Sequence, residues 1–282
     1  MAASVLLSGC SNVPLLQPGG PIGESERFVI GTAFTLMLIV VIPVIIMVIW
    51  FPRKYRASDT QHDYDPKWSD SARIDLVVWL IPAIIVLALG ALTWHESHRL
   101  DPSRPIETAI KPLKVEVVSL DWKWLFIYPD LNLATVNRLV IPVGVPLSFQ
   151  LTSDTVMTSF FIPQLGSQIY AIAGKRSRLH LLADRAGTYT GQNQQFSGAG
   201  FADMHFKVHA VTPQQFAAWV QHTRQAPHQL DLARYQVLRT PSADNPPQSF
   251  SGVRHELFES ILNRYRQPPS KLSGTGTTGK GN

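Results

Sequence analysis

The chain is 282 residues long, carries a formal net charge of +5 and contains one cysteine. This length can bury the core of one or two domains, but a single cysteine excludes an intramolecular disulfide. The basic residues are scattered along the chain, which does not support nucleic-acid binding and is typical of a surface next to an anionic membrane. Most apolar residues fall in two blocks near the N-terminus, and the rest of the sequence is typical of a soluble protein.

The first feature along the chain is Cys10, which ends the short apolar run VLLSGC. This run is similar to the lipobox of bacterial lipoproteins, in which a signal peptide is cut before a lipid-modified cysteine. The four residues at the N-terminus lack the positive charge typical of a signal peptide. We predict a signal peptide and N-terminal tail over residues 1–27, with lipidation of Cys10. The alternative is an unmodified cysteine in a trimmed signal peptide.

Two apolar segments follow, from Phe28 to Trp50 and from Ile74 to Trp94. Each is close to the ~20 residues that cross a bilayer as a helix. The second contains one acid, Asp75, in its first turn. The sequence therefore predicts a transmembrane helical hairpin over residues 28–100. Pro43 and Pro82 lie inside the spans, which favours packing against a larger membrane partner.

The loop between the two spans, residues 51–73, is rich in basic residues: Arg53, Lys54, Arg56, Lys67 and Arg73. The N-terminal tail offers only Arg27. By the positive-inside rule the loop is cytoplasmic, so we expect the N-terminus and everything after Trp94 on the outer, periplasmic face.

After a proline-rich link the pattern changes to short segments separated by Gly and Pro. We predict strands at residues 113–121, 138–141, 147–152, 178–183 and 205–211. Residues 205–211 alternate polar and apolar side chains, so one face of that strand is expected to be buried. Short strands without a βαβ rhythm indicate a β-sandwich over residues 101–212.

A helical extension is predicted over residues 213–266. Thr212, Pro213 and Gln215 form the start signal of its first helix, with Thr212 as N-cap and Gln215 completing a capping box. Further amphipathic stretches lie at residues 230–238 and 254–265. Residues 267–282, rich in Pro, Gly, Ser, Thr and Lys, are expected to be a disordered tail.

Two helices followed by an outer β-sandwich resemble subunit II of the haem-copper oxidases. Four motifs carry this resemblance in the family's order: WFPRKYR at 50–56, DWKW at 121–124, SDTVMTSFFIPQLG at 153–166 and GTYTGQ at 187–192. The last two are similar to the openings of the family's two metal loops, and DWKW to its aromatic motif. The resemblance implies a cupredoxin-like sandwich, and residues 213–266 resemble the aromatic-rich extension of quinol oxidases.

In the copper-bearing branch of this family, two copper ions are held by two His, two Cys, one Met and a Glu carbonyl. The resemblance maps these ligands onto Thr158, Asn193, Gln195, Ser197, Phe201 and Met204. Only Met204 matches, and a lone thioether without thiolate or imidazole cannot hold two copper ions. Met204 is therefore expected to pack rather than ligate. This departure is typical of the ubiquinol-oxidising branch.

The remaining histidines of the predicted strands do not replace the ligands. His180, His205 and His209 lie on the polar phase of their strands, and we expect them to face solvent.

The resemblance implies a non-catalytic subunit of a proton-pumping ubiquinol oxidase in the bacterial inner membrane. It implies no catalytic residue, metal or cofactor in this chain. Haems and a copper ion are expected in the partner subunit I, within a hetero-oligomer that has further small membrane subunits. Ubiquinol and the bilayer complete the expected partners.

Asp75 matches the position where the family carries a carboxylate at the cytoplasmic mouth of a proton-uptake path. Intramembrane acids are costly, which favours a functional role. The alternative is that Asp75 only interacts with the positive end of its helix.

The aromatic motif is expected to serve packing. Trp122 and Trp124 correspond to aromatic residues that relay electrons in copper-bearing relatives. Without copper that relay has no destination, so core or interface packing is expected. Asp121 and Lys123 are predicted to face water or subunit I.

Two other hypotheses remain. A copper-bearing cytochrome c oxidase subunit conflicts with the ligand positions. A metal-free, cupredoxin-like membrane lipoprotein with an assembly or scaffolding role is compatible with these positions. The prolines inside the spans and Asp75 favour a permanent oxidase partner over this second alternative.

Overall fold

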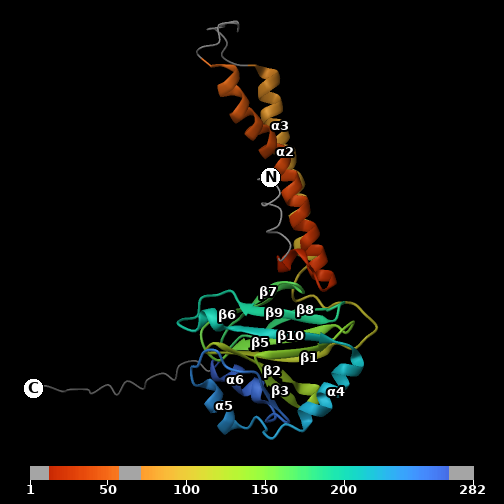
Figure 1. The fold of residues 1–282 in the computed structure, drawn as a ribbon, viewed down its shortest axis with the longest axis vertical. Coiled ribbons are helices and arrows are strands. Elements are labelled where there is room, and N and C mark those ends of the chain that lie inside the picture. Colours follow the sequence, from red (N-terminus) through yellow and green to blue (C-terminus); the bar gives the residue numbers. More distant parts are fainter. Residues whose placement is uncertain (1–12, 57–70, 267–282) are drawn as a thin grey trace, which may run out of the picture. The chain divides into compact units, whose positions relative to one another are not determined.

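The computed structural model describes residues 13–56 and 71–266. It has two compact units (Figure 1). The first combines the described residues up to Pro21 with those from Pro102 onward, and the second comprises residues 22–101.

The second unit is built from two long helices, α2 (Pro21–Lys54) and α3 (Ala72–Arg99), of 34 and 28 residues. Both are long and apolar enough to cross a membrane, and no residue in the most apolar stretch of either helix is buried. Helices of a soluble core would bury such side chains. The Arg99 guanidinium donates to Ser25 Oγ at 2.7 Å, which joins the start of α2 to the end of α3. The predicted helical hairpin is therefore present.

The first unit contains a sandwich of two mixed sheets. The first sheet has the strand order β11 (Gln248–Phe250), β3 (Leu133–Val136), β2 (Lys123–Tyr128), β1 (Leu113–Leu120), β5 (Leu147–Ser153) and β8 (Ser177–Leu181). The second has the order β4 (Arg138–Pro142), β10 (His205–Val211), β9 (Gly187–Asn193), β6 (Thr158–Ile162) and β7 (Gly166–Ala171). β1 runs parallel to β5 and β4 parallel to β10; the other pairs are antiparallel. The predicted β-sandwich is confirmed.

The space between the sheets is filled by aromatic side chains. Trp124 of β2 meets Phe160 of β6 and Phe206 of β10 edge-on, at centroid distances of 5.3 and 5.8 Å. Phe160 and Phe206 stack on each other at 5.2 Å. A Cβ atom at Gly191 would lie 2.1 Å from the Phe206 ring, so only glycine fits there. These ring contacts hold β6 and β10 against the first sheet.

The C-terminal extension, residues 213–266, adds three helices: α4 (Pro213–Arg224), α5 (Leu232–Arg239) and α6 (Leu257–Arg264). The predicted capping box is confirmed, since Thr212 and Gln215 bond each other's backbone N–H groups. The extension covers the outer face of the first sheet with a second hydrophobic core: Val118, Leu120, Leu125, Ile127, Ala134, Val136, Leu230, Tyr235, Leu238, Phe250, Leu257, Phe258 and Ile261. The first sheet is therefore buried on both faces.

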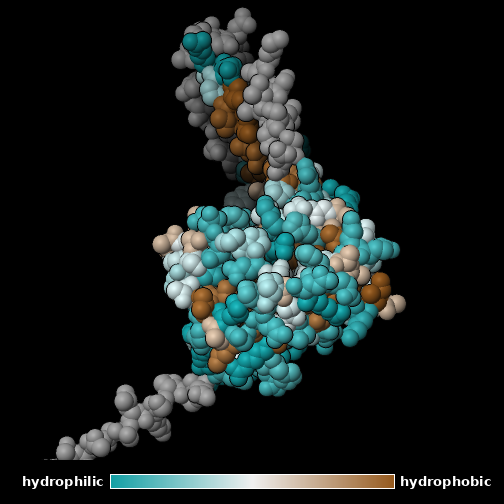
Figure 2. All heavy atoms as spheres, turned by 60° about the horizontal axis from the view of Figure 1, so that its bottom comes forward, coloured by the Kyte–Doolittle hydropathy of each residue, from teal (hydrophilic) through white to brown (hydrophobic). Residues whose placement is uncertain are grey.

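The surface agrees with this division of the chain. Figure 2 shows one face of the sandwich unit that is mostly hydrophilic, with small separate apolar patches, and a visible stretch of helix that is hydrophobic. A continuous apolar surface belongs to helices in a bilayer, whereas scattered patches are normal on a domain in water.

Candidate functional site

The six positions that the resemblance assigns to copper ligands lie at one end of the second sheet. Thr158 starts β6, Asn193 ends β9, and the rest lie in the connection from β9 to β10, which includes the short helix η4 (Phe201–Asp203). β6 and β9 are paired, with Phe160 opposite Asn193. This pairing brings the two loops together.

Asn193 is the centre of this end of the sheet and is 5% exposed. Its side-chain oxygen accepts from the backbone N–H groups of Ser159 and Gln195, both at 2.9 Å. Its Nδ2 donates to Gln195 O at 2.7 Å, Ser197 Oγ at 3.1 Å and Met204 Sδ at 3.3 Å. One carboxamide thus links β6 to the whole connection between β9 and β10. We call Asn193, Gln195, Ser197 and Met204 the Asn193 cluster.

The other two positions lie outside this cluster. Thr158 is fully buried and donates to Ser119 Oγ at 2.7 Å, which ties β6 to β1. The Phe201 ring contacts the Phe196 ring, with centroids 5.7 Å apart. Met204 is 1% exposed and packs within the cluster.

The chemistry of these groups does not fit two copper ions. The Asn193 amide nitrogen is a hydrogen-bond donor, and its oxygen is already engaged by two N–H groups. A hydroxyl, a phenyl ring and one thioether supply no thiolate or imidazole, which copper requires here. Within residues 13–56 and 71–266, no three His, Cys, Asp or Glu side chains gather in a metal-binding arrangement.

The two tryptophans of the aromatic motif have different surroundings. Trp122, in the turn after β1, has φ 60° and donates from Nε1 to Ser197 O at 2.9 Å. Its ring lies so close to Gly200 that a Cβ atom there would be 2.4 Å from it. Trp124 is fully buried between the sheets. Both therefore pack within the domain, Trp122 beneath the Asn193 cluster and Trp124 in the core.

Lys123 was predicted to face water or subunit I, but it is buried within the domain. It is 2% exposed, and its Nζ donates to Leu238 O at 3.0 Å, Thr240 O at 2.9 Å and Ser242 Oγ at 2.5 Å. Burial lowers the pKa of Lys123, and the Asp121 carboxylate opposes this shift. The ammonium supplies donors to carbonyls at the C-terminal end of α5, where helix carbonyls lack partners and a positive charge is stabilising. The C-terminal extension therefore buries Lys123, which was expected at the surface.

His180 is a second correction, since it is only 9% exposed. The residue lies in β8, and its backbone N–H donates to Pro102 O at 3.0 Å, so the linker covers this strand. Burial, and then Arg178, lower the pKa of His180. His205 is exposed as predicted, and His209 is partly exposed.

Asp154, at the start of the first loop, was not among the predicted site residues. Its side chain is fully buried. Its carboxylate accepts from Tyr235 Oη at 2.6 Å, Arg239 Nε at 2.7 Å and Arg264 at 2.8 Å, and its carbonyl accepts from Tyr265 Oη at 2.9 Å. Burial, followed by Asp154, raises the pKa of both tyrosine hydroxyls. We call these five residues the Asp154 hub. All four partners come from the C-terminal extension, so no local pattern could have revealed them.

Comparisons with known proteins agree with this architecture. A family model described as cytochrome c oxidase subunit II, periplasmic domain, matches residues 125–211, and one described as COX aromatic rich motif matches residues 224–268. The cytochrome bo(3) ubiquinol oxidase subunit 2 of Pseudomonas aeruginosa is 50% identical over 265 residues, which cover 94% of this chain and 80% of the relative. The ubiquinol oxidase subunit 2 of Acetobacter aceti is 46% identical over 278 residues, which cover 98% of this chain and 90% of the relative.

The chain belongs to the ubiquinol oxidase subunit 2 family.

Family membership agrees with the cupredoxin-like sandwich and with the two membrane-span candidates. Proteins of this family are subunits of an oxidoreductase, so the chain is part of an assembly of several chains in the inner membrane. A solved structure, the periplasmic domain of subunit II of the Bradyrhizobium japonicum cytochrome oxidase, covers 41% of this chain and 96% of its own. It is 25% identical, with a TM-score of 0.39.

The two remaining predicted site residues are Asp75 and Cys10. Asp75 is exposed in the first turn of α3, where its backbone N–H donates to Ser71 O at 2.9 Å. It therefore lies at the positive end of the helix, as both hypotheses about it require. Cys10 and its lipidation lie outside the described residues, as do Lys67 and the tail from residue 267.

Proposed function

We propose that this chain is the non-catalytic second subunit of a proton-pumping ubiquinol oxidase. In this proposal α2 and α3 bind the partner subunit I, which holds the haems and copper of oxygen reduction. Electrons from ubiquinol enter that partner directly and bypass the sandwich.

The observation that carries this proposal is the Asn193 cluster. At one of these positions the Asn193 oxygen accepts from two backbone N–H groups, and the two hydrogens of its Nδ2 are shared among three acceptors. The loops that carry copper in related subunits are closed here by amide and hydroxyl groups, which cannot exchange electrons. The sandwich keeps the fold of an electron-entry domain and serves as scaffold.

The test is to purify the tagged chain from its native membrane under mild detergent. We expect a haem-bearing, many-helix subunit to co-purify, and the complex to consume oxygen with ubiquinol but not with reduced cytochrome c. A haem-free monomer would favour the assembly lipoprotein instead. Copper bound to the sandwich in the ratio of copper-bearing relatives would refute the metal-free domain.

We also propose that the polar loop between the spans is cytoplasmic and that the sandwich is periplasmic. The basic residues Arg53, Lys54 and Arg56 at the end of α2 support this orientation. Protease added to intact spheroplasts should cut within the sandwich unit but not within residues 57–70. Cleavage only in inverted vesicles would reverse the orientation.

In this orientation Asp75 lies at the cytoplasmic end of α3, and we propose that it collects protons for subunit I. Asp75→Asn should lower quinol-driven, proton-coupled turnover several-fold, because a carboxamide cannot take up and release a proton. Asp75→Glu keeps a carboxylate and should keep turnover. Unchanged turnover in Asp75→Asn would reduce Asp75 to a residue that stabilises the end of its helix.

A further inference from the structure

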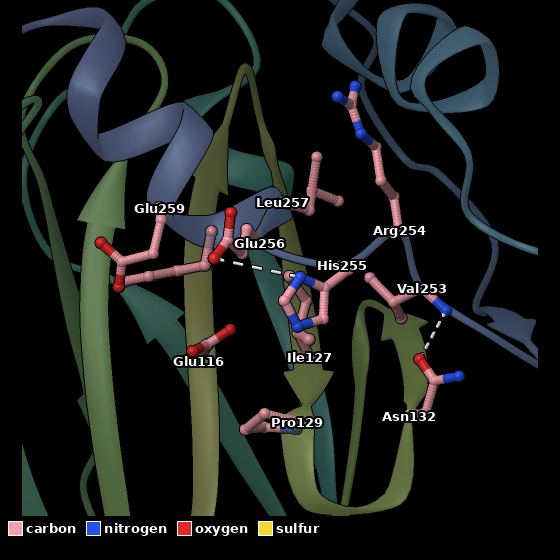
Figure 3. A pocket seen from close by; sticks show the side chains of 11 residues that line it. Glu116, Ile127, Pro129, Asn132, Val253, Arg254, His255, Glu256, Leu257 and Glu259 are labelled. Carbon is pink, nitrogen blue, oxygen red and sulfur yellow. Dashed lines mark hydrogen bonds and ion pairs between the residues drawn. The ribbon is translucent and has the colours of Figure 1, made fainter.

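A cavity of about 270 Å³ lies between the first sheet and the segment that leads into α6 (Figure 3). The sheet contributes Glu116 of β1 and Ile127 of β2, together with Pro129 and Asn132 beyond them. The extension contributes residues 253–259. In Figure 3 Glu116 extends from its strand toward the space below α6, the helix that carries Glu259. The sheet and the extension therefore both contribute carboxyl groups to the lining of one cavity: Glu116 from β1, and Glu256 and Glu259 from the extension.

The charged groups around Glu116 are arranged differently from those of the Asp154 hub, where two arginines pair with one carboxylate. Glu259 forms an ion pair with Arg176, whose guanidinium also lies 5.7 Å from the Phe258 ring centroid. Glu116 has no ion pair among the described residues. Burial raises the pKa of Glu116 to about 7; Glu259 adds to the shift, and Arg176 and then Lys114 oppose it. The remaining charged groups that line the cavity are Arg254, His255 and Glu256.

The far end of α6 is held differently. Arg264 donates to both Asp154 carboxylate oxygens at 2.8 Å, and Tyr265 Oη donates to Asp154 O at 2.9 Å. Arg266 Nε donates to Gly174 O at 3.1 Å. Arginine keeps its charge at all physiological pH values, so this end should stay bound throughout that range. One helix of 8 residues thus has a titratable side chain at the cavity next to its start, and ion pairs of constant charge at its end.

We propose that the junction of the first sheet with residues 253–259 is a pH-sensitive contact, in which a proton on Glu116 keeps this segment docked. Loss of that proton adds the negative charge of Glu116 to a cavity lining that already contains Glu256 and Glu259, and loosens the segment, while the Asp154 hub retains the end of α6. Because the pKa of Glu116 is raised by folding, its stabilisation is complete below the unfolded value of 4.5. It is lost as pH rises toward about 7.

The sandwich belongs to a periplasmic family model, so this contact would meet the pH of the compartment that receives pumped protons. That use rests on the proposed function. The contact itself does not, and its test needs no oxidase activity.

The test is hydrogen–deuterium exchange on the purified full-length protein between pH 5 and 8, with rates corrected for the intrinsic pH dependence of exchange. The whole shift of Glu116 corresponds to about 300-fold in the opening constant, and partial solvent screening reduces this, so we expect about tenfold or more. The rise should appear in amides 257–261 and be much smaller in amides 264–266 and in β1.

Glu116→Gln should abolish the pH response and keep amides 257–261 protected, because the amide mimics the protonated acid. Glu107→Gln is the matched control, since the Glu107 side chain is 89% exposed, and it should respond like the wild type. Asp154→Asn should raise exchange of amides 264–266 at every pH.

Three results would overturn the proposal. One is that the corrected exchange rates of the wild-type chain do not change with pH. This measurement does not depend on whether any variant folds. A second is a pH response that survives in Glu116→Gln but disappears in His255→Gln, which would assign it to the exposed His255–Glu256 pair. A third is an equal response in β1, which would indicate global rather than local opening.

Discussion

At the scale of single residues, two buried polar side chains organise the two loops that resemble the metal loops of copper-bearing relatives. Asn193 joins β6 to the connection after β9, and Asp154 joins the first loop to the C-terminal extension. Buried polar groups are costly unless they are fully hydrogen-bonded, so each of these side chains fixes the position of its partners. The loops are thus held by hydrogen bonds within the chain.

Asn193→Ala should destabilise the sandwich unit by about 2 kcal/mol, because it leaves the buried N–H group of Ser159 and the partly buried N–H group of Gln195 without their acceptor. Thermal unfolding of the detergent-solubilised chain, followed by circular dichroism, would measure this. Gln192→Ala, at the adjacent and less buried strand position, should change stability by less than about 0.5 kcal/mol. Equal effects of the two changes would contradict the bridging role.

At the scale of elements, local sequence patterns predicted some helices and strands and missed others. Thr212, Pro213 and Gln215 predicted the start of α4 because a capping box is made by residues three apart. β2 was not predicted. All six of its residues are buried, so its sequence lacks the alternation of polar and apolar side chains that marks a strand with one exposed face. β6 and β9 were taken as metal loops from the resemblance, and the two glycines of β9 do not favour a strand.

Thr212→Ala should destabilise the chain by about 1 kcal/mol through loss of the α4 N-cap. Chemical denaturation of the purified chain is the measurement. Gln214→Ala, which keeps the cap and introduces a better helix former, should be neutral or slightly stabilising. A Thr212→Ala variant as stable as the wild type would show that α4 is held by packing alone.

At the scale of the whole molecule, the C-terminal extension is part of the sandwich unit. Its apolar residues complete the second core on the outer face of the first sheet, and Lys123 fixes the end of α5 to β2. Without this cover the sheet would expose a contiguous apolar face, which soluble monomers rarely tolerate.

A chain that ends after Ala226 keeps α4 but loses α5, β11 and α6. We expect it to bind a hydrophobic dye strongly and to aggregate when its detergent is diluted. A chain that ends after Arg266 loses none of the described contacts and is the control. A well-behaved shorter chain with wild-type thermal stability would contradict the structural role of the extension.

The sequence by itself determined the helical hairpin, the sandwich class and the α4 cap. These depend on segment composition or on residues three or four apart. The burial of Lys123 and His180, the Asp154 hub and the cavity at Glu116 were decided by tertiary structure alone. The hub joins residues 81 to 111 positions apart, and the environment of a charge depends on which distant segment folds over it. The family resemblance mapped the ligand positions of copper-bearing relatives onto this chain, but only the folded chain shows that Asn193 joins the two loops that contain them.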